Sequence, residues 1–419
     1  GFISLILNFF IPLNDILIYL NFSFGIFFIY FFKDKIKLNY NIYSKIFIIL
    51  IFLLSLINIY GSNFSDDLHH YHAGYITNTD NHNYILGLNF LHHHYGYSSI
   101  WLILHSYLNF NNSLLQDIHI LNGLVLFLII AYLFTENNET LKNPKNSFLI
   151  LISGFILIFL LIKYTRLKEF GLDRPGTIIY CFLLYFTAKY NILIKKNINL
   201  KNQILFILFF FCLFITSIKI FFLSCFLIPI FLIIKSGAYS FVFNKFAFIF
   251  YFLCIAYFIK NIFITGCLIY PFELTCFSNL SWASNEISTN ILLGVESIAK
   301  SYDRYEGSLS MEEYIKNFNW LNTWIIRNIE EFNNYILTVL LALTLFFLTS
   351  KSSKNISKFN NLEILFLLLF IFNIIIFIKS PVSRYHHMFF IFLGLSFIIL
   401  SKRLFIKKIS FFNVALIII

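Results

Sequence analysis

Long apolar stretches recur from one end of the chain to the other, and they restrict what the chain can fold into. Of its 419 residues, 59% are hydrophobic and only 12% are charged. A run of about 20 apolar residues is long enough to cross a bilayer as a helix. The runs are continuous, whereas a transmembrane β-barrel has alternating segments of about ten residues. We therefore predict an all-α, polytopic integral membrane protein with about eleven transmembrane helices.

The predicted spans follow these apolar runs. They lie near residues 13–32, 45–60, 114–134, 147–164, 174–190, 203–219, 220–234, 246–262, 334–350, 361–378 and 388–400. The pair 203–219 and 220–234 could also be one long helix that is kinked around Lys219. We treat residues 1–419 as a single transmembrane domain and a fragment, because the chain begins at Gly1 and stops inside an apolar run.

The loops between the spans form two sets of different composition. One set gathers lysines and is predicted to be cytoplasmic, because basic residues concentrate in cytoplasmic loops. The same rule accounts for the net charge of +11 without a nucleic-acid partner. The other set is predicted to be extracytoplasmic and contains all the histidines except His119. It comprises a first long loop (61–113), a late long loop (263–333) and the short segments 165–173 and 379–387. Within the first loop, residues 98–109 are too short to span and suggest an amphipathic helix in the membrane interface.

The first outer loop opens with Ser65-Asp66-Asp67-Leu68-His69-His70-Tyr71-His72. Charged side chains beside hydrocarbon are costly, so this cluster suggests a catalytic or binding role rather than packing. A helix that begins after Ser65 would align Asp67 with Tyr71 and Asp66 with His70. One carboxylate of the pair could act as a general base, or both could hold a divalent cation with a phosphate. The alternative is a solvated helix start, where acidic residues are favoured by the helix dipole.

Histidines recur later in the same loop, in the stretch Asn89-Phe90-Leu91-His92-His93-His94-Tyr95-Gly96-Tyr97-Ser98-Ser99. Together with His69, His70, His72 and His82 they could bind zinc. Their spacings match no standard zinc ligand set, which favours a polar, aromatic loop.

Basic residues mark two further outer segments. Arg166, Lys168 and Arg174 lie between two predicted spans and could clamp a phosphate, although a charged turn with internal ion pairs is an equal alternative. Arg384, close to His386, suits a lipid-linked phosphate, with an ordinary snorkelling arginine as the alternative.

The late outer loop begins with a turn and two cysteines. Gly266 and Tyr270-Pro271 are typical of a backbone turn at the interface. Cys267 and Cys276 could pair, but a spacing of nine residues does not decide it. The tryptophans at 282, 320 and 324 are predicted to anchor the loop at the interface.

Taken in order, four motifs resemble those of the GT-C class of membrane glycosyltransferases, and most closely a group of uncharacterised bacterial GT-C-like polytopic proteins. The motifs are Asp67 with Tyr71-His72, Gly96-Tyr97-Ser98-Ser99-Ile100-Trp101, Asn261 with Thr265-Gly266 and Tyr270-Pro271, and Pro381 with Arg384-Tyr385. Thr265 stands where a serine is expected, and Ile100 is inserted before Trp101. The chain has no strict Asp-x-Asp, which leaves metal dependence open.

The resemblance implies a polyprenyl-phosphate sugar donor, a glycan, lipid or protein acceptor, and a site on the outer face of a bacterial cytoplasmic membrane. Asp67 would be the catalytic base, with Asp66 as the second choice and a divalent cation at the pair as an option. Arg384, with Arg166 or Arg174, would neutralise the departing lipid phosphate. The remaining substrate-binding candidates are Tyr71, His72, Tyr270 and His386. A polyprenyl tail would lie against the Phe-rich helices.

Two other functions fit the same sequence. An O-antigen polymerase or ligase also has a long late outer loop, here 263–333, and depends on Arg and His in late loops. A transporter or scaffold without chemistry often carries inverted repeats and charges at the membrane midplane. We find no repeat, and the charges lie at one surface.

Overall fold

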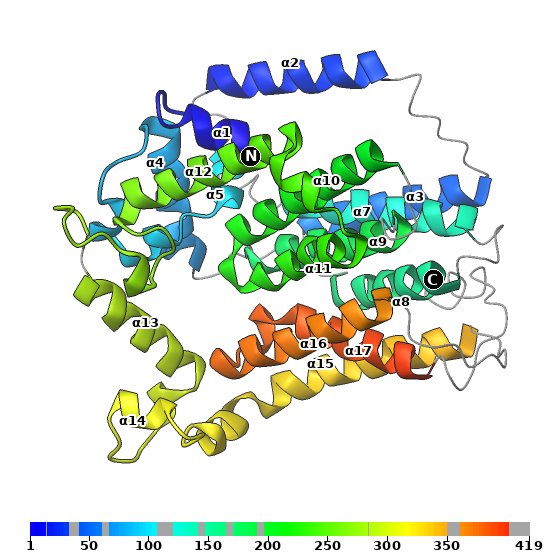
Figure 1. Cartoon of the computed structure of the whole chain (residues 1–419). Coiled ribbons are helices and arrows are strands. Elements are labelled where there is room, and N and C mark those ends of the chain that lie inside the picture. Colours follow the sequence, from blue (N-terminus) through cyan, green and yellow to red (C-terminus); the bar gives the residue numbers. More distant parts are fainter. Residues whose placement is uncertain are drawn as a thin grey trace.

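The computed structural model describes residues 1–13, 15–32, 42–60, 67–106, 120–140, 147–164, 171–190, 197–283, 285–349 and 361–401. These residues form sixteen α-helices and several shorter helical turns (Figure 1). The prediction of an all-α protein is confirmed.

The first half of the chain contains α1 (Phe2–Leu7), α2 (Asp15–Phe32), α3 (Ile42–Tyr60), η1 (Leu68–His72), α4 (Ala73–Asn81), η2 (Leu88–Phe90), η3 (His93–Tyr97), α5 (Ile100–Ser106), α7 (Ile120–Thr140), α8 (Ser147–Tyr164) and α9 (Asp173–Lys189). The second half contains α10 (Ile198–Ile218), η6 (Ile220–Phe226), α11 (Leu227–Ser236), η7 (Tyr239–Phe243), α12 (Lys245–Thr265), η8 (Glu273–Thr275), α13 (Asn285–Ala299), η9 (Tyr302–Arg304), α14 (Met311–Ile315), α15 (Leu321–Thr349), α16 (Asn361–Lys379), η10 (Ser383–Tyr385) and α17 (His387–Ser401).

Helix α8 lies at the centre of the bundle. It contacts α7, α9, α15 and α17, and every residue from Ile152 to Leu161 is buried. A helix that is apolar on all sides must be covered on all sides, so the sequence of α8 suits this position. Gly394 lets α17 approach α8 closely, because a Cβ at this position would lie 2.2 Å from the Phe155 ring.

Several helices expose large apolar side chains in a way that suits lipid. On α16, Ile364, Leu368, Ile371 and Ile375 are exposed along one face. The opposite face is buried and includes Leu365 and Leu369 among others. An exposed stripe of this kind would be costly in water, but a hydrocarbon environment accepts it.

The structure does not support eleven full-length spans. In the part of the chain that it describes, three helices are long and apolar enough to cross a membrane: α10, α12 and α16. Shorter apolar helices cover 45–56, 120–136, 152–163, 220–236 and 387–400. A bilayer crossing needs about 20 helical residues, and several predicted spans are shorter or interrupted. The span expected at 220–234, for example, begins as the 3₁₀ turn η6 before α11 starts. A membrane protein remains the conclusion.

Described parts of the two long loops predicted to be extracytoplasmic lie at one end of the bundle. Figure 1 shows α4, α5, α13 and α14 together on the left of the view. Lys379, at the last turn of α16, forms an ion pair with Glu296 of α13 at 2.5 Å. This contact joins the 379–387 segment to the late long loop.

Two expectations for these outer segments need correction. Helix α5 is not an amphipathic helix with one face open, because all but one of its seven side chains are buried and it contacts α1, α4 and α10. Trp320 and Trp324 are buried within the protein as well, at 5% and 7% exposure. The Trp324 Nε1–H donates to the Pro381 carbonyl at 2.6 Å, so this ring fixes one outer segment to another.

Candidate functional site

Lys219 lies at a break between two apolar helical elements. Helix α10 ends at Ile218, and Lys219 is extended (φ −155°, ψ 130°) before η6 begins. At this break, one charged side chain interrupts a long hydrophobic stretch. In a membrane protein such a charge is rare and normally has a partner.

The Lys219 ammonium group has two partners from distant segments. Its Nζ forms an ion pair with Asp173, the first residue of α9, and both side chains are mostly buried. The same Nζ lies 3.5 Å from the centre of the Tyr385 ring, in a cation–π contact. Lys219 therefore connects the start of α9 to η10.

His386 follows η10 and is buried beside this charge. Its ring meets Phe221 at 5.2 Å and Phe377 at 5.5 Å between ring centres, both edge to face. Burial, together with a smaller contribution from the charge of Lys219, lowers the pKa of His386 to about 3. The Nε2 atom is buried without a hydrogen-bond partner in the described part of the chain. His386 is thus a neutral, polar group in an apolar setting.

His72 reaches the same charge from the first outer loop. It is the last residue of η1 and is 3% exposed. Burial lowers its pKa to about 3, with smaller contributions in the same direction from Lys219 and His94. Lys219 therefore acts on both His72 and His386, whose segments are far apart in the sequence.

Tyr97 and Tyr270 lie on another side of this cluster. Their rings meet edge to face at 5.4 Å, and Tyr97 interacts electrostatically with Tyr385. Burial raises the pKa of both phenols. Both hydroxyl groups are buried without a hydrogen-bond partner among the described residues, and so is the Ser383 hydroxyl. Buried polar groups normally have partners, so this group of unmet hydroxyls is typical of a place where a polar ligand or water binds.

Two of the sequence motifs, the one at 96–101 and the one that begins at Asn261, contact each other next to Tyr97. The Ser98 hydroxyl donates to Asn261 Oδ1 at 3.4 Å, and the fully buried Lys260 donates from Nζ to the Ser98 carbonyl. Gly96 lies so close to Tyr270 that a Cβ would be 2.5 Å from the ring. Only glycine fits here without displacing Tyr270.

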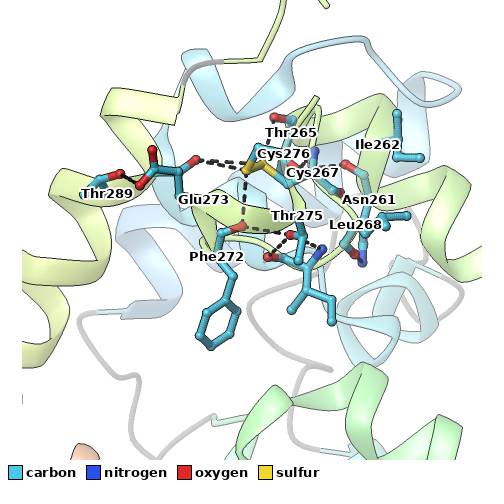
Figure 2. Close-up of a disulfide and its surroundings, with 12 residues drawn as sticks. Asn261, Ile262, Thr265, Cys267, Leu268, Phe272, Glu273, Thr275, Cys276 and Thr289 are labelled. Carbon is cyan, nitrogen blue, oxygen red and sulfur yellow. Dashed lines mark hydrogen bonds between the residues drawn. A yellow bond between two sulfur atoms is a disulfide. The ribbon is translucent and has the colours of Figure 1, made fainter. Parts of the chain in front are cut away.

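A disulfide and a set of hydrogen bonds fix the loop between Cys267 and Cys276 (Figure 2). Cys267 and Cys276 are bonded, which settles the pairing that the sequence left open. Asn261 Nδ2–H donates to the Leu268 carbonyl at 2.8 Å, and Thr275 Oγ1 bonds the backbone of residue 269. The turn expected at Gly266 is present, with the glycine in the left-handed region (φ 74°) as the cap of α12. Tyr270 is therefore held by a braced loop.

A second group of basic side chains lies next to the Lys219 cluster. Arg174 directly follows Asp173, and its charge acts on His387 together with those of Lys163 and Lys219. The His387 Nε2 atom is 2.7 Å from the Tyr335 hydroxyl. Lys163 Nζ lies 3.5 Å above the Tyr335 ring. We name His72, Tyr97, Asp173, Arg174, Lys219, Tyr270, Tyr385 and His386 the outer polar cluster.

Asp67 precedes the turn that carries His72. It is partly exposed, and its side chain makes no capping hydrogen bond. Residues 68–72 form a π-helical turn, in which the Ala73 N–H donates to the Leu68 carbonyl, where the sequence predicted an α-helix; the expected helix start at Ser65 and Asp66 lies outside the described residues. Single π turns occur frequently at functional sites.

The other predicted site residues fall into two groups. The structure brings His72, Tyr270, Arg174 and His386 into the outer polar cluster. Tyr71 lies beside it, with its ring against His72 at 4.3 Å. Asp66, Arg166 and Lys168 lie outside the described residues, and so does the side chain of Arg384.

Sequence reasoning missed the roles of Lys219 and Asp173. The sequence marks Lys219 only as the point where a long helix could kink, and it does not single out Asp173 within the charged segment 165–173. The available signal was one lysine in an otherwise apolar stretch of about 30 residues, since an ionisable residue within such a stretch is a candidate functional residue by default.

Comparison with known proteins gives one match. A family model described as a domain of unknown function, DUF8201, matches residues 1–391. No curated protein and no solved structure matches the chain.

Proposed function

For this chain, which belongs to the DUF8201 family of unknown function, we propose the activity of a membrane glycosyltransferase. The enzyme would use a polyprenyl-phosphate-linked sugar on the extracytoplasmic face. The observation that carries the proposal is the meeting of five segments around Lys219. These segments are η1, the start of α9, residues 96–99, residues 266–270, and η10 with His386.

The donor phosphate is the natural ligand of Lys219 in this proposal. A lysine ammonium binds phosphate as a point charge, and Arg174 supplies a second positive charge nearby. Positive charge that is already in place stabilises the anion that forms as the sugar departs. The exposed apolar faces of helices such as α16 give a polyprenyl tail a surface to lie on.

The sugar and acceptor would meet the buried hydroxyls of the cluster. Tyr97, Tyr270 and Ser383 carry hydroxyl groups that lack protein partners in the described residues. Sugar hydroxyls both donate and accept hydrogen bonds, so they match these groups.

The proposed reaction is an inverting transfer. The acceptor oxygen attacks the anomeric carbon, and the bond between that carbon and the phosphate oxygen breaks. The bonding electrons stay on the polyprenyl phosphate, whose new charge faces Lys219 and Arg174. Asp67, with Asp66 as the alternative, takes the acceptor proton. A divalent cation at these two carboxylates stays a prediction.

The disulfide supports an outer location for the site. Cys267–Cys276 lies in the 263–333 loop, and disulfides persist in oxidising compartments outside the cytoplasm. The free cysteines 181, 212, 225 and 254 lie in or beside the apolar helices.

An O-antigen polymerase or ligase is the second candidate. Such proteins depend on Arg and His in late loops, and His386 lies buried in a late segment of this chain. The native host tests both through its surface-glycan profile. Asp67→Asn abolishes the glycan in the glycosyltransferase mechanism, whereas the polymerase mechanism keeps the glycan in Asp67→Asn and loses it in His386→Gln. An unchanged profile for Asp67→Asn, at wild-type protein level, rules out the catalytic role of Asp67.

A further inference from the structure

Three consecutive histidines converge next to the outer polar cluster. The ligand atoms of His92, His93 and His94 all lie within 4.8 Å of one another. The rings are in mutual contact, with centres 5.0 Å apart for His92 and His93, 5.1 Å for His92 and His94, and 4.0 Å for His93 and His94.

The backbone explains how neighbouring residues can point to one place. His92 is extended (φ −156°, ψ 123°), and the 3₁₀ turn η3 starts at His93. Successive side chains of an extended strand point to opposite sides, and those of a regular 3₁₀ helix are about a third of a turn apart. The change from one conformation to the other at His92 brings the three rings together, which residue spacing alone does not reveal.

A stacked tyrosine holds this group in place. The Tyr71 ring lies nearly parallel to His94 at 4.4 Å and to His92 at 6.0 Å. Tyr71 belongs to η1, so the contact joins the turn that carries His72 to the turn that carries Tyr97. His93 is exposed, which leaves the group open to solvent on one side.

One ring nitrogen of the group is available to bind a metal ion. His94 Nδ1 is buried and has no hydrogen-bond partner in the part of the chain that the structure describes. His92 Nδ1 accepts a hydrogen bond from the His94 backbone N–H at 3.3 Å. That bond is long, so ligation by His92 replaces it at small cost.

We propose that His92, His93 and His94 form a binding site for a late first-row divalent metal ion, with zinc as the natural occupant. Neutral imidazole nitrogen suits zinc, nickel, cobalt and copper, and the group contains no carboxylate that would favour calcium or magnesium. Three protein ligands leave a position open for water or for the nearby His70, whose charge acts on His94. With His70 as the fourth ligand, the ion would join η3 to η1 and so hold Tyr97 in place. This site does not depend on the proposed transferase activity.

Cobalt is the most informative probe, because its visible absorption reports nitrogen coordination. The full chain is purified in lipid nanodiscs through a tag without histidine, stripped with chelator and titrated with Co²⁺. We expect saturable visible bands at one ion per chain, and Zn²⁺ should abolish them. His93→Gln and His94→Ala should each weaken binding by about tenfold or more. His82→Ala is the matched control, since it removes an exposed histidine from the same loop.

His93→Gln changes an exposed side chain, so it keeps the test valid if His94→Ala fails to fold. Two results overturn the proposal. One is Co²⁺ binding that is equally tight in the wild type, His93→Gln and His82→Ala. The other is binding that appears only as weak, unsaturable adsorption of adventitious ions.

Discussion

Replacing Lys219 with methionine removes one positive charge from the outer polar cluster and keeps most of the apolar stem. In the proposed function this charge binds the donor phosphate. A charge-assisted hydrogen bond contributes about 1.5–3 kcal/mol, which corresponds to roughly a 10- to 150-fold loss in affinity for polyprenyl phosphate. The variant also leaves Asp173 without its partner, and both side chains are only 17–21% exposed.

Stability and binding have to be separated in this experiment. Loss of one member of a mostly buried pair destabilises the protein by about 1–3 kcal/mol through the other member, which stays charged and desolvated. Asp173→Asn removes the competitor for the Lys219 ammonium without removing the ammonium itself. It should therefore bind polyprenyl phosphate at least as tightly as the wild type, whereas Lys219→Met should not.

The assay is the thermal shift of the full chain in nanodiscs, titrated with polyprenyl phosphate. Lys235→Met is the matched control, because it removes the same charge from an exposed position at the end of α11. A dissociation constant for Lys219→Met within about twofold of the Lys235→Met value refutes the assignment of Lys219. Weaker binding in Asp173→Asn than in Lys219→Met would also contradict it.

Three other perturbations test the surroundings of the cluster. The pKa of His386 is lowered to about 3 from 6.5, so the unfolded chain binds the extra proton first and stability falls as pH drops from about 6.5 toward 3. His386→Phe should flatten this dependence in thermal melts recorded across that range, and an unchanged slope would argue against a buried neutral ring. Gly96→Ala forces a methyl group against Tyr270 and should cost about 1–3 kcal/mol in denaturation, while Gly171→Ala, where nothing lies within 4 Å, serves as the control for the same substitution without a steric clash. Cys276→Ser opens the disulfide and should lower stability by about 2–4 kcal/mol, and the same loss should follow treatment of the wild type with reductant.

The sequence was sufficient for the class of fold because hydrophobicity is a local property. Runs such as 361–378 predict apolar helices directly, and α16 (Asn361–Lys379) follows that prediction closely. The number of spans was not predictable in the same way. Whether 220–234 forms a full helix depends on the break at Lys219 and on the 3₁₀ turn after it, and hydropathy does not register either feature.

The site was predictable in its members more than in its arrangement. His72, Tyr270 and His386 were candidates because they lie in or beside motifs that resemble those of GT-C glycosyltransferases. Their meeting point was hidden, since Lys219 pairs with a residue 46 positions away. Contacts of that kind come from helix packing, and a single sequence carries no signal for them.

The metal site proposed at His92, His93 and His94 was also not predictable from the sequence. The spacings of the histidines in this loop argued against a zinc site, because they match no standard ligand set. A change of backbone conformation at His92 reverses that argument, and only the structure reveals the change.

The most direct test of the account is the fate of the donor lipid. The full chain is reconstituted in liposomes made with lipids extracted from its native host, and free polyprenyl phosphate is followed over time by mass spectrometry. The account predicts that polyprenyl phosphate accumulates with the wild type and does so far more slowly with Asp67→Asn and Lys219→Met. Equal accumulation in all three, with all three folded, would contradict a transferase mechanism at this cluster.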